Sequence, residues 1–168
     1  MEKYKVDYSE LSYFKGITID FDSLEEGLDY AQRHNIKDVL VRSEKNDIKR
    51  VVNFDFLNRR DFIQTFHWIV SLSKRSNITG LYHLSKLKDF RWGVDNNFDL
   101  DLSLFPVLEK VNISYDVKIS GWEMLHQLNW LQLRKVRTDN LSFLEKAISL
   151  QYLRIIGGSF TSIEGLEK

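Results

Sequence analysis

The sequence predicts an α/β solenoid, in which short parallel strands stack side by side and short helices or irregular segments cover one side of the sheet. Three observations support this fold. An apolar pattern recurs along the chain with a period of 20–22 residues. Within each copy, two apolar residues stand two positions apart, as they do on one side of a strand. The segments between copies, such as 122–126 and 142–147, place apolar residues at helical or half-helical spacing.

The repeated pattern is an apolar residue, two others, an apolar residue, one other and a third apolar residue. It recurs in 87–92, 108–113, 128–133 and 150–155, so the first residues of successive copies are 21, 20 and 22 positions apart. Because one unit of this size cannot bury its apolar side alone, the stacked units must share a continuous core. The apolar residues are Leu87, Phe90 and Trp92; Leu108, Val111 and Ile113; Leu128, Leu131 and Leu133; and Leu150, Leu153 and Ile155.

Two further copies precede these four. Residues 48–56 between them form an irregular strand pair or a degenerate unit, and the pattern assigns no register to residues 43–66. The earlier copies are Ile36, Val39 and Val41, which begin the array, and Phe66, Ile69 and Ser71.

The residues before the array predict a cap of mixed structure. Alternating polarity over residues 4–22 predicts a strand pair that turns near Gly16. Ser23, followed three residues later by Glu26, forms a capping box that begins a helix running to about His34. The cap is therefore expected to cover the first open edge of the sheet.

A second helix is predicted near residues 58–65, where an apolar stripe follows a capping asparagine. We expect a single domain over residues 1–168. It consists of the cap and degenerate units in 1–57 and the repeats in 58–168, with an incomplete last repeat.

Composition excludes several functional classes. The 24 basic residues balance 24 acidic ones, so bulk charge does not attract nucleic acid or an anionic membrane. The chain has no cysteine, which excludes a disulfide scaffold, a thiolate metal site and a cysteine nucleophile. Residues 1–9 lack an apolar leader, and no stretch reaches the ~18 consecutive apolar residues of a membrane helix. We therefore expect a cytoplasmic protein.

No motif indicates an enzyme, a metal or a cofactor. The pair at 157–158 lacks the lysine of a phosphate-binding loop, and no two histidines have the spacing of a helical zinc site. Residues 95–101 place oxygen ligands at alternate positions, as a calcium loop does. Leu100 and Pro106 stand where that loop needs glycine and glutamate, which favours a solvated loop. We expect no catalytic, metal or cofactor residues.

Alternation along the predicted strands places a second set of residues on the outward face of the sheet. A register shifted by one residue is the alternative, and it would place the rings of this set in the core. The outward columns are Asp38, Trp68, Asp89, Lys110, Trp130 and Tyr152; Leu40, Val70, Arg91, Asn112, Gln132 and Arg154; and Arg42, Leu72, Gly93, Ser114, Arg134 and Ile156.

The outward columns are unusual for a merely solvated surface. Large rings prefer burial, whereas Trp, Tyr and Arg are the residues that most often anchor protein interfaces. Five basic residues face two acidic ones, so we expect a protein partner with an acidic surface. The predicted partner-binding residues are Trp68, Arg91, Lys110, Trp130, Gln132, Arg134, Tyr152 and Arg154.

The repeated copies resemble leucine-rich repeats of the irregular bacterial type, over about the last hundred residues of the chain. Members of that family are curved solenoids that mostly bind proteins on the concave sheet, which is what the resemblance implies here. Regular members carry asparagine three positions after the third apolar residue. This chain has Asp95, Asp116, Val136 and Gly158 there, so the asparagine ladder is absent.

These inferences predict a protein-interaction module that binds its partner on the concave sheet face and acts, by analogy with small solitary repeat proteins, as a bacterial immunity or regulatory factor. The alternative is a structural protein that self-associates through the last strand, 150–156, because the final unit has no polar cap. A further alternative partner is single-stranded nucleic acid, bound by Trp stacking and Arg–phosphate contacts. The chain has no basic excess, which disfavours this partner.

Overall fold

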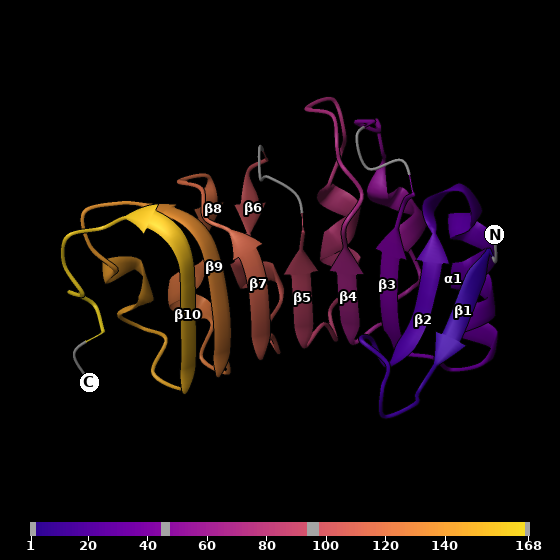
Figure 1. The fold of residues 1–168 in the computed structure, drawn as a ribbon, viewed down its shortest axis with the longest axis horizontal. Helices are drawn as coiled ribbons and strands as arrows, with labels where there is room; N and C mark the ends of the chain where they lie inside the picture. The colour runs from indigo at the N-terminus through magenta and orange to yellow at the C-terminus, as the bar shows by residue number, and fades with distance from the viewer. Residues whose placement is uncertain (1–2, 45–47, 94–97, 167–168) are drawn as a thin grey trace.

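The computed structural model describes residues 3–44, 48–93 and 98–166. Its main feature is one open sheet of eight strands in the order β1-β2-β3-β4-β5-β7-β9-β10 (Figure 1). The first pair is antiparallel and every later pair is parallel. The strands are β1 (Tyr4–Asp7), β2 (Gly16–Asp20), β3 (Asp38–Arg42), β4 (Thr65–Trp68), β5 (Asp89–Trp92), β7 (Lys110–Ser114), β9 (Trp130–Arg137) and β10 (Tyr152–Ser159).

One α-helix and several short 3-10 turns cover one side of this sheet and leave the other side open, as Figure 1 shows with the open face toward the viewer. A small parallel pair, β6 (Leu100–Asp101) and β8 (Ile119–Ser120), lies apart from the main sheet. The helix is α1 (Leu24–Arg33), and the turns are η1 (Phe21–Ser23), η2 (Phe54–Leu57), η3 (Thr79–His83), η4 (Leu102–Leu104), η5 (Trp122–Met124) and η6 (Ser142–Leu144).

The structure contradicts the predicted α/β solenoid, although the predicted parallel pairing is confirmed. The chain instead forms a mixed, open sheet with an antiparallel pair at one edge and few helices. Successive parallel strands from β3 to β10 begin 27, 24, 21, 20 and 22 residues apart, by subtraction of their first residue numbers. The apolar spacing fixes which residues form strands, but the connections differ in length and structure and do not repeat one unit.

The N-terminal elements agree with the sequence in part. The strand pair and the helix over 24–33 are confirmed. The turn predicted near Gly16 is wrong, because Gly16 begins β2 and residues 8–15 connect the two strands. The capping box is wrong, because the Ser23 side chain makes no capping hydrogen bond. Asp20 instead accepts from the backbone N–H of Asp22 at 3.0 Å and begins η1, so the chain enters α1 through a 3-10 turn.

The helix predicted over 58–65 does not form. Arg59 has a positive φ of 65°, which a continuing α-helix excludes. Arg60 turns inward instead, where its guanidinium donates to the Asp29 carboxylate at 2.5 Å and to the Gln32 side chain at 2.6 Å. A buried guanidinium must be paired, so this segment is held by its contact with α1 rather than by helical hydrogen bonds.

Two rows of apolar side chains, aligned by the shared strand register, form the core between the sheet and the turns. All but one of the ten are 0% exposed, and Trp92 is 1% exposed. The first row is Val39, Phe66, Phe90, Val111 and Leu131, and the second is Val41, Trp68, Trp92, Ile113 and Leu133.

The register predicted for β4 is wrong. Phe66 and Trp68 point into the core, so Trp68 does not face outward. Phe66 is therefore the second apolar residue of its copy, whereas the predicted copy of Phe66, Ile69 and Ser71 made it the first. Both registers fit the apolar spacing. The observed one buries the Trp68 ring against Phe54, with centroids 4.7 Å apart, and so removes more apolar surface from water.

The last strand is ordered and pairs with β9 along its length. Leu153 and Ile155 are only partly buried, whereas their β9 partners Leu131 and Leu133 are 0% exposed. No strand pairs with the outer edge of β10 among the described residues. In the same ranges, no helix has both the length and the apolar character of a membrane span.

Trp68→Ala is expected to lower the free energy of unfolding by about 3–5 kcal/mol, because it removes a fully buried ring whose Nε1 donates to the Val70 carbonyl at 2.8 Å. Denaturant unfolding of this variant beside Trp130→Ala measures the difference. Since Trp130 is only partly buried, its loss should cost clearly less. Equal losses would contradict the register of β4.

Candidate functional site

The open face of the sheet is built from two rows of side chains that lie at the same level on neighbouring strands. The rows match the first two predicted outward columns except at β4, where Thr65 and His67 stand in place of Trp68 and Val70. Six of the eight predicted residues lie in these rows, and Arg134 follows Gln132 on the same side of β9. Trp68, and Leu72 of the third predicted column, are buried instead. The rows are Asp38, Thr65, Asp89, Lys110, Trp130 and Tyr152; and Leu40, His67, Arg91, Asn112, Gln132 and Arg154.

A stacked pair of rings marks the β9–β10 end of the open face. The centroids of Trp130 and Tyr152 lie 5.3 Å apart with ring planes at 5°. Tyr152 is 44% exposed, so the stack presents ring surface to solvent. Lys110 pairs with Trp130 in the register, and Arg154 follows two residues after Tyr152 on the same side of β10. Neither cation forms an ion pair with any residue in the described ranges.

Arg134, predicted as a binding residue, is committed to the protein's own polar groups. Its guanidinium donates to the side chain of Asn112, to Ser114 Oγ at 3.3 Å and to the backbone carbonyl of Trp92 at 2.7 Å. Gln132 donates to the same Asn112 oxygen at 3.3 Å. These bonds tie β9 to β7 and β5 across the open face and fix the orientation of the Asn112 amide.

The loop between β1 and β2, residues 8–15, folds over the open face. Its Phe14 ring lies 5.1 Å from the His67 ring, and its Tyr13 hydroxyl accepts a hydrogen bond from the Arg91 guanidinium. The guanidinium carbon also lies 5.8 Å from the centre of the Tyr13 ring. The sequence pattern does not predict this contact, because it joins residues 78 positions apart. A signal was present, since Tyr13 and Phe14 are adjacent rings outside the repeats.

The carboxylates of the open face on β3 and β5 are paired within the protein. Asp89 lies 3.0 Å from His67 Nε2, and Asp38 accepts from the Thr65 hydroxyl at 2.6 Å. On β5, β7, β9 and β10 the two rows and Arg134 carry four cations against the single carboxylate of Asp89. Positive charge therefore gathers toward the β10 end.

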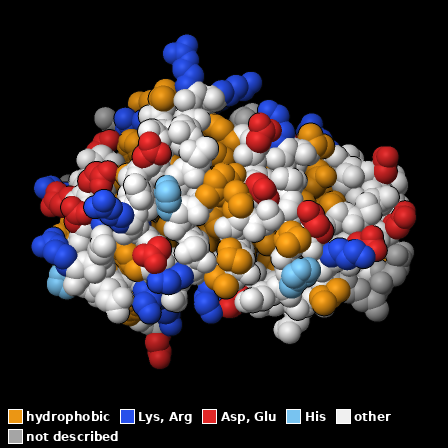
Figure 2. All heavy atoms as spheres, turned by 180° about the vertical axis from the view of Figure 1, so that it is seen from behind, with side chains coloured by type: hydrophobic (Ala, Val, Ile, Leu, Met, Phe, Trp, Pro, Cys, Tyr) orange, Lys and Arg blue, Asp and Glu red, His pale blue; other side chains and the backbone are white. Residues whose placement is uncertain are grey.

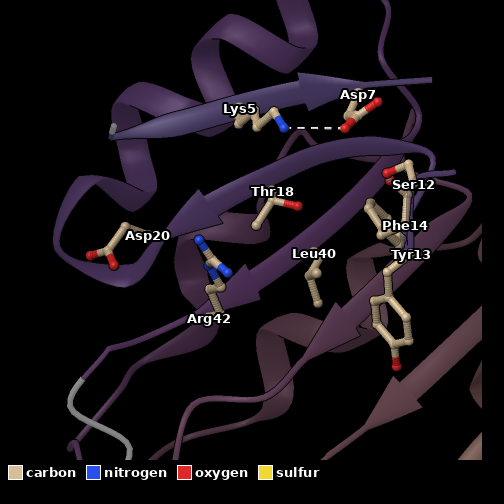
Figure 3. Close-up of a pocket in the computed structure, with 9 residues that line it drawn as sticks. All are labelled: Lys5, Asp7, Ser12, Tyr13, Phe14, Thr18, Asp20, Leu40 and Arg42. Carbon is tan, nitrogen blue, oxygen red and sulfur yellow. Dashed lines mark hydrogen bonds and ion pairs between the residues drawn. The ribbon is translucent and has the colours of Figure 1, made fainter. Parts of the chain in front are cut away.

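A first pocket, of about 380 Å³, lies between the loop and the N-terminal strands. Figure 3 shows Lys5 and Asp7 on β1, joined by an ion pair of 3.2 Å, above Thr18 and Leu40 on the next strands. The Tyr13 side chain extends from the loop away from β1, past Leu40 (Figure 3).

A second pocket, of about 350 Å³, lies on the other side of Tyr13 and reaches Trp130. Tyr13 lines both pockets and separates them. The second pocket, called the donor pocket below, is lined by Tyr13, His67, Asp89, Arg91, Lys110, Asn112 and Trp130.

The opposite face has a different character. Figure 2 shows basic and acidic side chains interspersed there with apolar ones, so neither sign of charge dominates. Exposed apolar side chains of the connections, including Met124 at 53% and Ile148 at 71%, are single residues rather than a ring stack beside unpaired cations.

The described residues contain no group of three His, Asp or Glu placed to hold a metal ion. Three residues of the segment considered as a calcium loop, Asp95, Asn96 and Asn97, lie outside the described residues. Asp101 accepts from the Ser103 backbone N–H at 2.9 Å and caps η4, which gives this carboxylate a structural role.

Comparisons with family models, with curated proteins and with solved structures give no match to this chain. The open face is therefore interpreted from its own chemistry. It combines exposed ring surface, two pockets and two cations that form no ion pair with any described residue.

The carboxylate of Asp7, in the first pocket, is expected to titrate at low pH. The backbone N–H and then the hydroxyl of Ser9, followed by Lys5, lower the pKa of Asp7 from 3.8 to about 2. A lowered pKa means that this carboxylate stabilises the fold above about pH 3.8, and that the contribution is lost as the pH falls toward 2. An NMR titration of the Asp7 carboxyl carbon measures the midpoint.

Ser9→Ala should raise that midpoint part of the way, because the backbone donor remains, and Lys5→Gln should raise it less. A wild-type midpoint near 3.8 would contradict the turn geometry at Ser9.

Proposed function

We propose that this protein binds a protein partner through the open face of its sheet, with the stack of Trp130 and Tyr152 as the anchor. The observation that carries this proposal is the parallel ring stack of the partly buried Trp130 and the exposed Tyr152, beside two cations, Lys110 and Arg154, without partners among the described residues. Large rings with adjacent basic groups are the usual centres of binding energy at protein interfaces.

Charge supports an acidic partner. The β5–β10 half of the open face carries four cations against one carboxylate, and that carboxylate is occupied by His67. The whole chain has no net charge, so this local excess affects where a partner docks rather than how it is attracted from a distance. The same neutrality weighs against nucleic acid as the partner.

The biological role belongs to the same proposal. A 168-residue chain that offers one recognition face suits an immunity or regulatory factor that masks one target. The resemblance of the repeated apolar spacing to leucine-rich repeats favours such a role in bacteria. A cytoplasmic setting is part of this proposal, since the 168 residues contain no cysteine and need no disulfide.

Self-association is the second candidate, and one observation favours it. The eight residues of β10 contain neither lysine nor proline, the residues that commonly protect sheet edges, and the outer edge pairs with no described strand. Sedimentation equilibrium between about 5 and 500 μM tests this candidate. A mass that rises with concentration supports it, and a monomer throughout this range contradicts it.

The double variant Trp130→Ala, Tyr152→Ala is expected to lose partner binding. Truncation of a central ring typically costs about 2 kcal/mol, which corresponds to about 30-fold weaker affinity. Affinity capture from a lysate of the source cells, followed by mass spectrometry and titration of the captured protein, measures the effect.

The matched control is Met124→Ala, Ile148→Ala, which removes two exposed apolar side chains from the connections without touching the open face. The proposal requires a protein that the wild type and the control both retain and the ring variant loses. Retention by all three proteins would place the interface elsewhere, provided that their unfolding curves agree.

A further inference from the structure

The donor pocket stands out on the open face because every side chain that lines it, except Asp89, carries a hydrogen-bond donor. Arg91 and Lys110 contribute cationic groups, and the Tyr13 hydroxyl stands at the rim, where it accepts from Arg91. A phenol that accepts one hydrogen bond still has its own proton to donate. The pocket therefore offers a ligand several N–H and O–H groups.

Asn112 adds another donor, and its orientation follows from its neighbours. Arg134 and Gln132, both on β9, donate to its amide oxygen. An oxygen fixed toward β9 turns the Nδ2 group of the same amide away from β9, on the side of the pocket that Arg91 lines. Because a guanidinium can only donate, the atom of Asn112 that Arg134 contacts must be the amide oxygen.

The one carboxylate that lines the donor pocket is already used. Asp89 contacts His67 Nε2 at 3.0 Å, and His67 is held in turn by the Phe14 ring. Against this paired group stand the charges of Arg91 and Lys110. Arg91 also has a buried Nε atom with no hydrogen-bond partner, so its donors are incompletely satisfied. An anion in the pocket would balance the charges of Arg91 and Lys110.

Two rings bound the same pocket. Tyr13 closes it on the side of the loop, and Trp130, stacked on Tyr152, closes it at the other end. The volume of about 350 Å³ is at the small end of the range of about 300–1,000 Å³ for ligand pockets. Ring walls on two sides favour a flat apolar group, and the donors favour a carboxylate attached to it.

We infer that the donor pocket binds an aryl carboxylate, meaning a planar ring joined to a carboxylate through a link of one or two carbon atoms. Arg91, Lys110 and Asn112 receive the carboxylate, and the ring lies between Tyr13 and Trp130. This inference rests on the proposed function and deepens it, since a partner whose C-terminal residue is aromatic would present this group. A free small aryl carboxylate has the same chemistry.

The test is an NMR titration of the isotopically labelled protein with phenylacetate, beside phenylacetamide, which has the ring but no charge, and acetate, which has the charge but no ring. We expect saturable phenylacetate binding with a dissociation constant on the order of millimolar. The shifted signals should belong to Tyr13, Arg91, Asn112 and the Trp130 indole, and phenylacetamide should bind about tenfold more weakly. Equal binding of phenylacetate and phenylacetamide, or shifts centred elsewhere, would overturn the inference.

Lys110→Gln should weaken phenylacetate binding by about tenfold, because it removes a charge that lines the pocket. Arg42→Gln removes an exposed cation from the same face but from the first pocket, and it should leave the affinity unchanged. An unchanged affinity in Lys110→Gln would contradict the assigned contacts.

N-acetylphenylalanine distinguishes the two sources of the ligand. Tighter binding of this compound than of phenylacetate indicates a peptide C-terminus, and weaker binding indicates a free aryl carboxylate. The titration is independent of partner capture. If capture depends on Trp130 and Tyr152 while phenylacetate fails to bind, the pocket inference is wrong and the proposed function stands. If phenylacetate binds while capture does not depend on Trp130 and Tyr152, the pocket inference stands and the proposed function is wrong.

Discussion

The shared register of the parallel strands is the constraint on which the rest of this structure depends. Burial of Phe66, Phe90 and their neighbours in one row, and of Trp68 and Trp92 in the next, fixes each strand against the one before it. Because side chains alternate along a strand, the register that aligns the core rows also aligns the rows on the other face. The packing of the core therefore also positions the side chains of the open face.

Polar contacts on the open face then divide its residues into two groups. Arg134 and Asp89 are engaged by other groups of the protein, Arg134 by three acceptors and Asp89 by His67. Lys110 and Arg154 have no such partners in the described ranges, and the rings of Trp130 and Tyr152 stack beside them. A pre-organised network next to unengaged donors reduces the cost of ordering an interface, since the supporting side chains are already held in place.

The 8–15 loop restricts the access of a ligand to the open face. Its Tyr13 contacts Arg91 and separates the two pockets, so the loop decides which part of the open face a ligand reaches. The adjacent rings of Tyr13 and Phe14 mark this loop in the sequence, but no local pattern predicts which strands the loop contacts. Alternation over 4–22 predicted the strand pair correctly, but it said nothing of where the residues between the strands would lie.

The sequence by itself determined the later strands and their outward residues, because 108–113 and 128–133 each allow one register that buries three apolar side chains. It also determined the parallel pairing and the helix over 24–33. Only the tertiary structure decided the register of β4, where Phe66 with Trp68 or with Ile69 would satisfy the spacing and ring packing selects the former. The absence of a helix at 58–65, the loop over the open face and the open mixed sheet in place of a solenoid were likewise decided by contacts between distant residues. Such contacts depend on surface that becomes buried only when the strands assemble. The spacing of residues along the chain therefore does not predict them.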